Sequence, residues 1–126
     1  MSASKKTLLI AVIGAGLAGL SCAQALLQTG HTVHVFDKSR GPSGRMSTRR
    51  AEDAAGPWQC DHGAQYFTAR HPQFRAEVAR WQQAGVAAVW DARLASFDGT
   101  AWTTPATPLV RFVGTPRMTS PAGWLV

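Results

Sequence analysis

The chain has 126 residues and an ordinary apolar share of 45%, which suits one small globular domain and excludes a disordered or fibrous protein. Its net charge of +6 attracts anions, but the basic residues outside positions 38–50 are scattered and form no nucleic-acid motif. The expected partner is therefore a small molecule, and neither nucleic acid nor a membrane.

The N-terminus imitates a secretory signal. Lys5 and Lys6 precede an apolar run over residues 7–20, and the small-residue sequence Ala-Gln-Ala follows at 23–25. The run is too short to span a bilayer, and its glycines fall in a register that a signal peptide does not require. A strand that enters a glycine-rich turn explains both features, so a small secreted protein is the weaker alternative.

The first part of the chain predicts a βαβ unit. Residues 8–13 are a continuous apolar, β-rich run, which predicts a strand buried on both faces of a parallel sheet. Residues 16–29 predict a helix, and Gly30 is placed to end it. The leucines of this helix supply its apolar face: Leu17, Leu20, Leu26 and Leu27. Residues 32–36 predict a second strand that ends at Asp37.

The turn between the first strand and the helix fits the pattern G-x-G-x-x-G through Gly14, Gly16 and Gly19. Gly14 permits the tight turn, Gly16 lets the backbone approach a pyrophosphate, and Gly19 lets the helix pack close to the strand. The helix N-terminus then offers N–H groups to the phosphates. Asp37 can accept hydrogen bonds from both ribose hydroxyls of an adenosine and would repel a 2′-phosphate. The sequence predicts an adenine dinucleotide site; glycines that serve packing alone, with Asp37 as a helix cap, are the alternative.

A basic, glycine-bearing segment follows Asp37 and is predicted as loop or short helix over residues 38–56. Its cations are Lys38, Arg40, Arg45, Arg49 and Arg50. The guanidinium of Arg45 can bind pyrophosphate oxygens as a fork, which adds charge that the helix dipole does not supply. An exposed basic loop with no ligand is the alternative.

The second half of the chain predicts one helix and several short strands. Residues 72–84 begin with a proline, end before a glycine, and carry apolar side chains at helical spacing. Those side chains are Phe74, Val78 and Trp81. Asp98-Gly99 predicts a hairpin turn between strands at 94–97 and 101–103, and residues 109–113 predict a further strand.

The two cysteines, Cys22 and Cys60, match no zinc spacing, and the four histidines are scattered, so no metal site is expected. Both cysteines are expected to be reduced thiols of a cytoplasmic protein, and the helix that carries Cys22 is expected to bury it.

Two later segments carry a resemblance to a known family. They are Gly44-Arg45-Met46-Ser47-Thr48 and Asp61-His62-Gly63-Ala64-Gln65-Tyr66-Phe67. Together with residues 12–21 and 36–38, this combination resembles the renalase-like branch of the flavin-containing amine oxidase superfamily, over about residues 10–118. The resemblance implies an α/β fold: an incomplete Rossmann-like βαβ FAD/NAD(P)-binding domain with a few additional short strands.

The resemblance also implies roles for particular residues. The pyrophosphate would lie against Gly14, Ala15, Gly16, Leu17, Ala18 and Gly19. Asp37 and Lys38 would flank the adenosine ribose, and Arg45, with Met46 beside it, would reach phosphate. The flavin would lie near Gly63, Ala64 and Gln65. No catalytic residue is identified: His62 could act as a proton shuttle, but a structural histidine is the favoured interpretation.

The chain departs from the family in two respects. Ser43-Gly44 stands where the family has a glycine pair, and serine is strained there unless its φ is negative. The family's members are much longer, and the apolar tail over residues 119–126, with Trp124, is unlike a domain end. The chain is therefore expected to be an N-terminal fragment, with an FAD-binding unit over 1–70 and the start of a substrate domain over 71–126.

The expected function is that of an FAD-binding oxidoreductase that oxidises a reduced nicotinamide-like or amine substrate with oxygen as acceptor. The alternative is a dinucleotide-binding module without catalysis. A βαβ unit with an open edge and apolar faces is also expected to be completed by a second chain or to self-associate.

Overall fold

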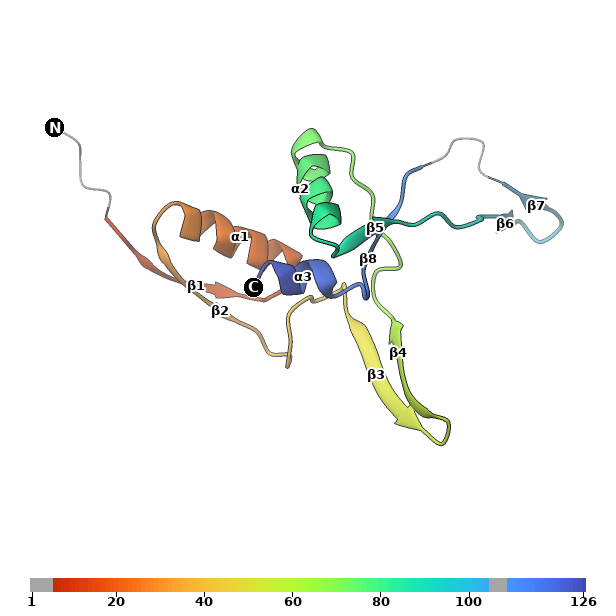
Figure 1. Ribbon diagram of the computed structural model, residues 1–126, viewed down its shortest axis with the longest axis horizontal. Coiled ribbons are helices and arrows are strands. Elements are labelled where there is room, and N and C mark those ends of the chain that lie inside the picture. Colours follow the sequence, from red (N-terminus) through yellow and green to blue (C-terminus); the bar gives the residue numbers. More distant parts are fainter. Residues whose placement is uncertain (1–5, 105–108) are drawn as a thin grey trace.

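The computed structural model describes residues 6–104 and 109–126, so Lys5 of the signal-like pattern lies outside the described residues. The elements in chain order are β1 (Leu9–Ile13), α1 (Leu17–Gln28), β2 (Thr32–Phe36), β3 (Thr48–Asp53), β4 (Gly56–Asp61), α2 (Pro72–Gln83), β5 (Ala87–Val89), β6 (Ser96–Phe97), β7 (Trp102–Thr103), β8 (Phe112–Gly114) and α3 (Ser120–Trp124). β1 and β2 pair in parallel, with Leu9 opposite Thr32, and α1 lies along one face of the pair (Figure 1). The predicted βαβ unit is confirmed.

α1 ends in a hydrogen-bonded glycine cap. Gly30 has a φ of +86°, and its N–H donates to the carbonyl of Leu27 at 2.9 Å. The N–H of His31 donates to the carbonyl of Leu26 at 3.2 Å. This pair of bonds satisfies carbonyls that have no partner within the helix, and it requires a residue that tolerates positive φ. The predicted helix stop at Gly30 is confirmed.

Only a narrow stripe of α1 is buried. Leu20 and Ala23 lie in the interior, and Leu17 packs against the core from its edge. The predicted apolar face extends too far, because Leu27 is 54% exposed. Cys22 is exposed as well, so the prediction that the helix buries it is wrong. A helix that covers a pair of strands buries one stripe, and these two side chains lie outside it.

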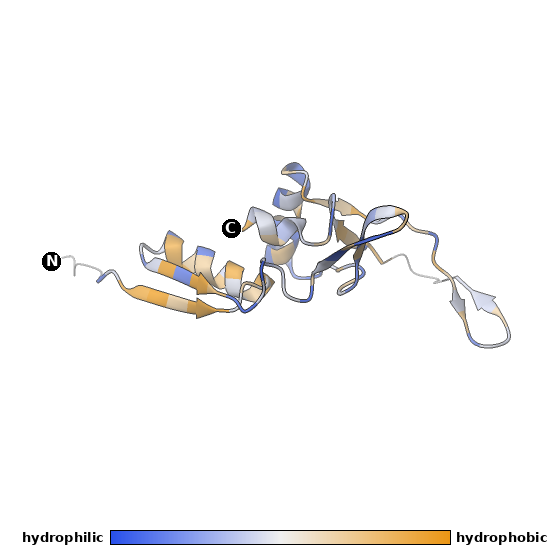
Figure 2. Ribbon diagram, turned by 90° about the horizontal axis from the view of Figure 1, so that it is seen from below, coloured by the Kyte–Doolittle hydropathy of each residue, from blue (hydrophilic) through white to orange (hydrophobic). Residues whose placement is uncertain are grey.

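The face of β1 and β2 away from α1 is uncovered. Leu9 and Ile13 are 74% and 82% exposed, and Phe36 is exposed at the end of β2. Figure 2 shows the hydrophobic colour along β1 with no element over it on that side. The prediction that this strand is buried on both faces is therefore wrong for the structure, because α1 covers one face only.

The segment expected as loop or short helix contains a strand instead. β3 pairs antiparallel with β4, with Thr48 opposite Asp61 and Asp53 opposite Gly56. The β3 sequence, Thr-Arg-Arg-Ala-Glu-Asp, lacks an apolar alternation because most positions on both faces are exposed. The pattern that reveals a half-buried strand was therefore absent.

The core joins elements that are distant in sequence. Its buried members are Ala15, Leu20, Val78, Trp81, Ala87, Ala122 and Leu125. Val78 and Trp81 come from α2 and confirm the predicted helical face, while Phe74 packs from its edge. The apolar tail folds back as α3, where Ala122 is fully buried and the side chain of Gln24 donates to the carbonyl of Leu125 at 3.4 Å. The tail is thus a structural element, which the sequence did not suggest.

The remaining strands are short. β6 and β7 form the predicted hairpin around Asp98-Gly99, and this hairpin extends away from the core (Figure 1). β8 pairs antiparallel with β5 and begins later than the predicted strand at 109–113. Among the described residues, no helix is long and apolar enough to cross a membrane. The domain division at residue 70 stays a prediction.

Candidate functional site

The turn after β1 is built on the steric freedom of glycine. Gly14 has a φ of +106°, and its N–H donates to the carbonyl of Phe36 at 2.7 Å, which ties the ends of β1 and β2 together. A Cβ on Gly19 would lie 1.9 Å from the carbonyl oxygen of Gly14. No side chain fits at that distance, so α1 packs directly on the turn, as the glycine pattern predicts.

A second glycine-bearing loop crosses in front of the α1 N-terminus. The N–H of Ser43 donates to the carbonyl of Ala15 at 2.9 Å. A Cβ on Gly44 would lie 3.3 Å from the Cα of Gly16, which caps α1. Ser43 is nearly fully buried with a φ of +128°, so the strain expected for a serine in place of glycine is present. The two loops hold each other in place around the helix N-terminus.

Asp37 stands at the end of β2 and bonds to both loops. One carboxylate oxygen accepts the N–H of Ala15 at 2.6 Å, and the other accepts the N–H of Ser39 at 2.7 Å and the Ser39 hydroxyl. These bonds, that of the Ser39 hydroxyl first, lower the pKa of Asp37 to about 2. The side chain is exposed. It therefore presents a permanent negative charge to any ligand beside the turn.

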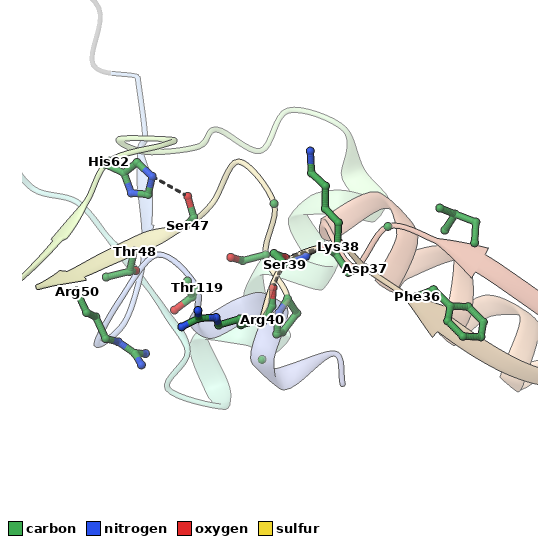
Figure 3. A pocket seen from close by; sticks show the side chains of 17 residues that line it. Phe36, Asp37, Lys38, Ser39, Arg40, Ser47, Thr48, Arg50, His62 and Thr119 are labelled. Atoms are coloured by element: carbon green, nitrogen blue, oxygen red, sulfur yellow. Dashed lines mark hydrogen bonds between the residues drawn. The ribbon is translucent and has the colours of Figure 1, made fainter.

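A cleft of about 1260 Å³ opens beside these loops (Figure 3). Of the predicted site residues, Gly14, Asp37 and Lys38 line it. Within the described part of the chain the other predicted residues do not line it: Ala15, Gly16, Leu17, Ala18, Gly19, Arg45, Met46, Gly63, Ala64 and Gln65. Their contacts with a cofactor stay predictions.

The residues present fit an adenine dinucleotide. The Ala15 N–H is occupied by Asp37, and the first-turn amides at 17–19, which do not line the cleft, have no acceptor inside a helix and stay the predicted phosphate donors. Ala15 and Ser39 fill three of the roughly four lone-pair sites of the Asp37 carboxylate, so about one site is left for a ribose hydroxyl. Gly14 and Asp37 thus lie together at the cleft, and the binding of a dinucleotide there stays a prediction.

The two segments that carry the family resemblance also lie together. The N–H of Ala64 donates to the carbonyl of Arg45 at 2.8 Å, and a Cβ on Gly63 would lie 2.0 Å from that same oxygen. His62 lines the cleft, and its Nε2 is 3.4 Å from the hydroxyl of Ser47 (Figure 3).

Several cleft residues were not predicted from the sequence. Thr48 and Arg50 come from β3 and occupy one face of that strand by its two-residue period. Thr119 and Gly123 come from the end of the chain. Recognising β3 as a strand would have suggested the first two residues. No local signal places the last two, because the fold brings them to the cleft.

Residues 12–81 match a family described as NAD(P)-binding Rossmann-like domain. The chain belongs to this family. The match covers more than half of the sequence and includes the turn, Asp37 and most of α2. The predicted fold class, a Rossmann-like α/β unit, is confirmed.

Two named relatives resemble part of the chain. An L-amino acid oxidase of Cerastes cerastes is 35% identical over 72 residues, which are 57% of this chain and 14% of that protein. A zeta-carotene-forming phytoene desaturase of Myxococcus xanthus is 49% identical over 47 residues, 37% of this chain and 9% of that protein. The chain thus spans about a seventh or less of these two relatives.

A solved structure of a putrescine oxidase double mutant, from a redesign of its cofactor binding, shares the fold with a TM-score of 0.50 and 22% identity. The match covers 81% of this chain and 22% of that one.

Proposed function

We propose that this chain is the cofactor-binding part of an FAD-dependent oxidoreductase and holds the ADP end of FAD in the cleft. The observation that carries the proposal is the position of Asp37. Its ionised carboxylate stands at the tip of β2, beside the Gly14 turn, and lines the cleft. An acid at that place suits the two ribose hydroxyls of an adenosine.

The relatives support FAD as the dinucleotide. L-Amino acid oxidases, phytoene desaturases and putrescine oxidase are FAD-dependent, and FAD is the cofactor predicted from the sequence. Their activities belong to much longer proteins, so oxidoreductase chemistry is part of the proposal for this chain.

Within that proposal the chain supplies placement and charge. Asp37 accepts a ribose hydroxyl at its remaining lone pair, and the amides at the start of α1 donate to the pyrophosphate. Bound FAD supplies the acceptor for the electrons of the substrate. Gly14 permits the turn, and Gly19 lets α1 pack directly on it, so the first-turn amides lie beside the turn.

We further propose the renalase-like branch, with a reduced nicotinamide-like or amine substrate and oxygen as acceptor. The support is the contact between the two motif segments through the Arg45 carbonyl and the Ala64 N–H. In this arrangement Arg45 and Met46 contact the phosphates of the cofactor. The peptide segment of Gly63, Ala64 and Gln65 contacts the flavin.

The proposal also includes the cellular location of the chain and its association with other chains. A cytoplasmic location agrees with Cys22 and Cys60, both exposed and free of a disulfide. The uncovered face with Leu9 and Ile13 supports completion by a second chain or self-association.

Absorbance of the purified chain tests flavin binding, with bands expected at about 375 and 450 nm. Asp37→Ala is expected to weaken FAD binding by roughly tenfold or more, since a charged hydrogen-bond acceptor for the ribose is lost. Glu52→Ala, which removes an exposed carboxylate from β3 outside the cleft, is the matched control and should leave affinity unchanged. Equal FAD affinity in the wild type and in Asp37→Ala would remove Asp37 from the site. Reduction of the bound flavin by an added amine or reduced nicotinamide dinucleotide would separate an oxidoreductase from a binding module.

A further inference from the structure

The cleft has a cationic part that the proposed ADP site does not use. Arg40 and Arg50 both line the cleft, together with the hydroxyl-bearing residues Thr48 and Thr119. Arg40 comes from the loop after β2, Arg50 from β3, and Thr119 from the residue before α3. In Figure 3 the Arg40 side chain extends toward Thr119, and Arg50 projects from the strand that carries Thr48.

Strand geometry selects Arg50 from the Arg49-Arg50 pair. Side chains alternate between the two faces of a strand, so Thr48 and Arg50 share one face of β3 and Arg49 lies on the other. Their partners in the hairpin follow the same alternation, with Arg50 opposite Gln59. Accordingly Arg50 lines the cleft, and Arg49 does not.

The two cleft arginines have no acidic partner. Among the residues that the structure describes, the one ion pair within 4.0 Å joins Arg80 to Glu77 on α2. The charged side chains that line the cleft are Asp37, Lys38, Arg40 and Arg50, three cations against one carboxylate. That carboxylate already accepts hydrogen bonds from Ala15 and Ser39. The cleft therefore carries a net positive charge, since its three cations exceed its one carboxylate.

We propose that Arg40 and Arg50 form a phosphate-binding subsite of this cleft. A guanidinium binds phosphate oxygens in pairs, and two guanidiniums from different elements suit a group with two negative charges. The phosphate belongs either to the dinucleotide held at Asp37 or to a second phosphorylated molecule. The subsite deepens the proposed function and rests on it for the first of these two sources.

The test compares two arginines that are neighbours in sequence. Calorimetric titration of ADP into the 126-residue chain is carried out on the wild type, Arg50→Ala and Arg49→Ala. Both variants remove one exposed positive charge from β3, so both are expected to keep the circular dichroism of the wild type. Arg50→Ala is expected to raise the Kd by about tenfold and Arg49→Ala by less than about twofold, because Arg49 acts only through screened long-range charge. Arg40→Ala serves as the second variant and should follow Arg50→Ala.

Inorganic phosphate is titrated into the same proteins with and without FAD, which separates the two sources. A selective loss of ADP affinity in Arg50→Ala assigns the subsite to the dinucleotide. A selective loss of phosphate binding by the FAD-loaded chain assigns it to a second molecule. Equal behaviour of Arg50→Ala and Arg49→Ala with both ligands overturns the subsite. A wild type that binds phosphate through Arg50 but neither ADP nor FAD supports the subsite and refutes the proposed function.

Discussion

Ser43 is the one residue other than glycine with a positive φ in the described part of the chain, and substituting it by glycine should stabilise the protein. Its φ of +128° lies far from the left-handed region near about +60° that other residues occasionally adopt. Such a conformation costs about 1–3 kcal/mol for a residue with a Cβ. Glycine removes that cost but loses about 0.5–1 kcal/mol to the greater freedom of the unfolded chain.

The net effect of Ser43→Gly is a gain of about 1 kcal/mol in the free energy of unfolding, or roughly 3–6 °C in Tm for a chain of this size. Urea titration followed by the fluorescence of the five tryptophans measures it. Ser43→Ala keeps the Cβ and should leave stability within about 0.5 kcal/mol of the wild type. Ser21→Gly, on the exposed side of α1, should lower stability by about 0.5 kcal/mol. A Ser43→Gly protein that is no more stable than Ser43→Ala would refute the argument from backbone strain.

Three other outcomes follow from the site. Gly19→Ala should lower the free energy of unfolding by about 1–3 kcal/mol in a urea titration, because its Cβ would meet the Gly14 carbonyl oxygen at 1.9 Å; an unchanged midpoint would contradict the close packing. The pKa of Asp37 is lowered to about 2, so the stability that its ionised form contributes is full above the ordinary aspartate pKa of 3.8 and is lost as the pH falls through about 2. Nucleotide affinity measured from pH 8 to 5 should therefore show no titration of Asp37. Asp61→Ala should lower Tm, since Asp61 accepts the Thr48 hydroxyl and a backbone N–H just before α3, and a Tm equal to that of the wild type would show that this link does not contribute.

The βαβ unit could be predicted because its signals are local. Gly14, Gly19 and Gly30 stand where the backbone turns or packs closely, and those needs are met by single residues at fixed spacing. Asp37 directly follows β2, which is separated from the turn only by α1 and a short connection. Its position beside the turn can therefore be predicted from the order of β1, α1 and β2 along the chain.

The β3–β4 hairpin and α3 could not be predicted in the same way. β3 exposes most of its residues on both faces, so its sequence carries no apolar alternation, and its partner strand supplies the hydrogen bonds that define it. α3 is too short to be stable alone and exists because Ala122 and Leu125 pack into the core. The cleft residues that these elements carry were missed with them.

The sequence by itself determined the dinucleotide turn, the helix that follows it, and the acid at the tip of β2, because each depends on contacts within about one βαβ unit. Only the tertiary structure decided which cations enter the cleft. Arg50 faces it and Arg49 does not because β3 pairs with β4, and Thr119 reaches it because the tail returns to the core. Burial and side-chain direction depend on which elements meet, and a local pattern does not contain that information.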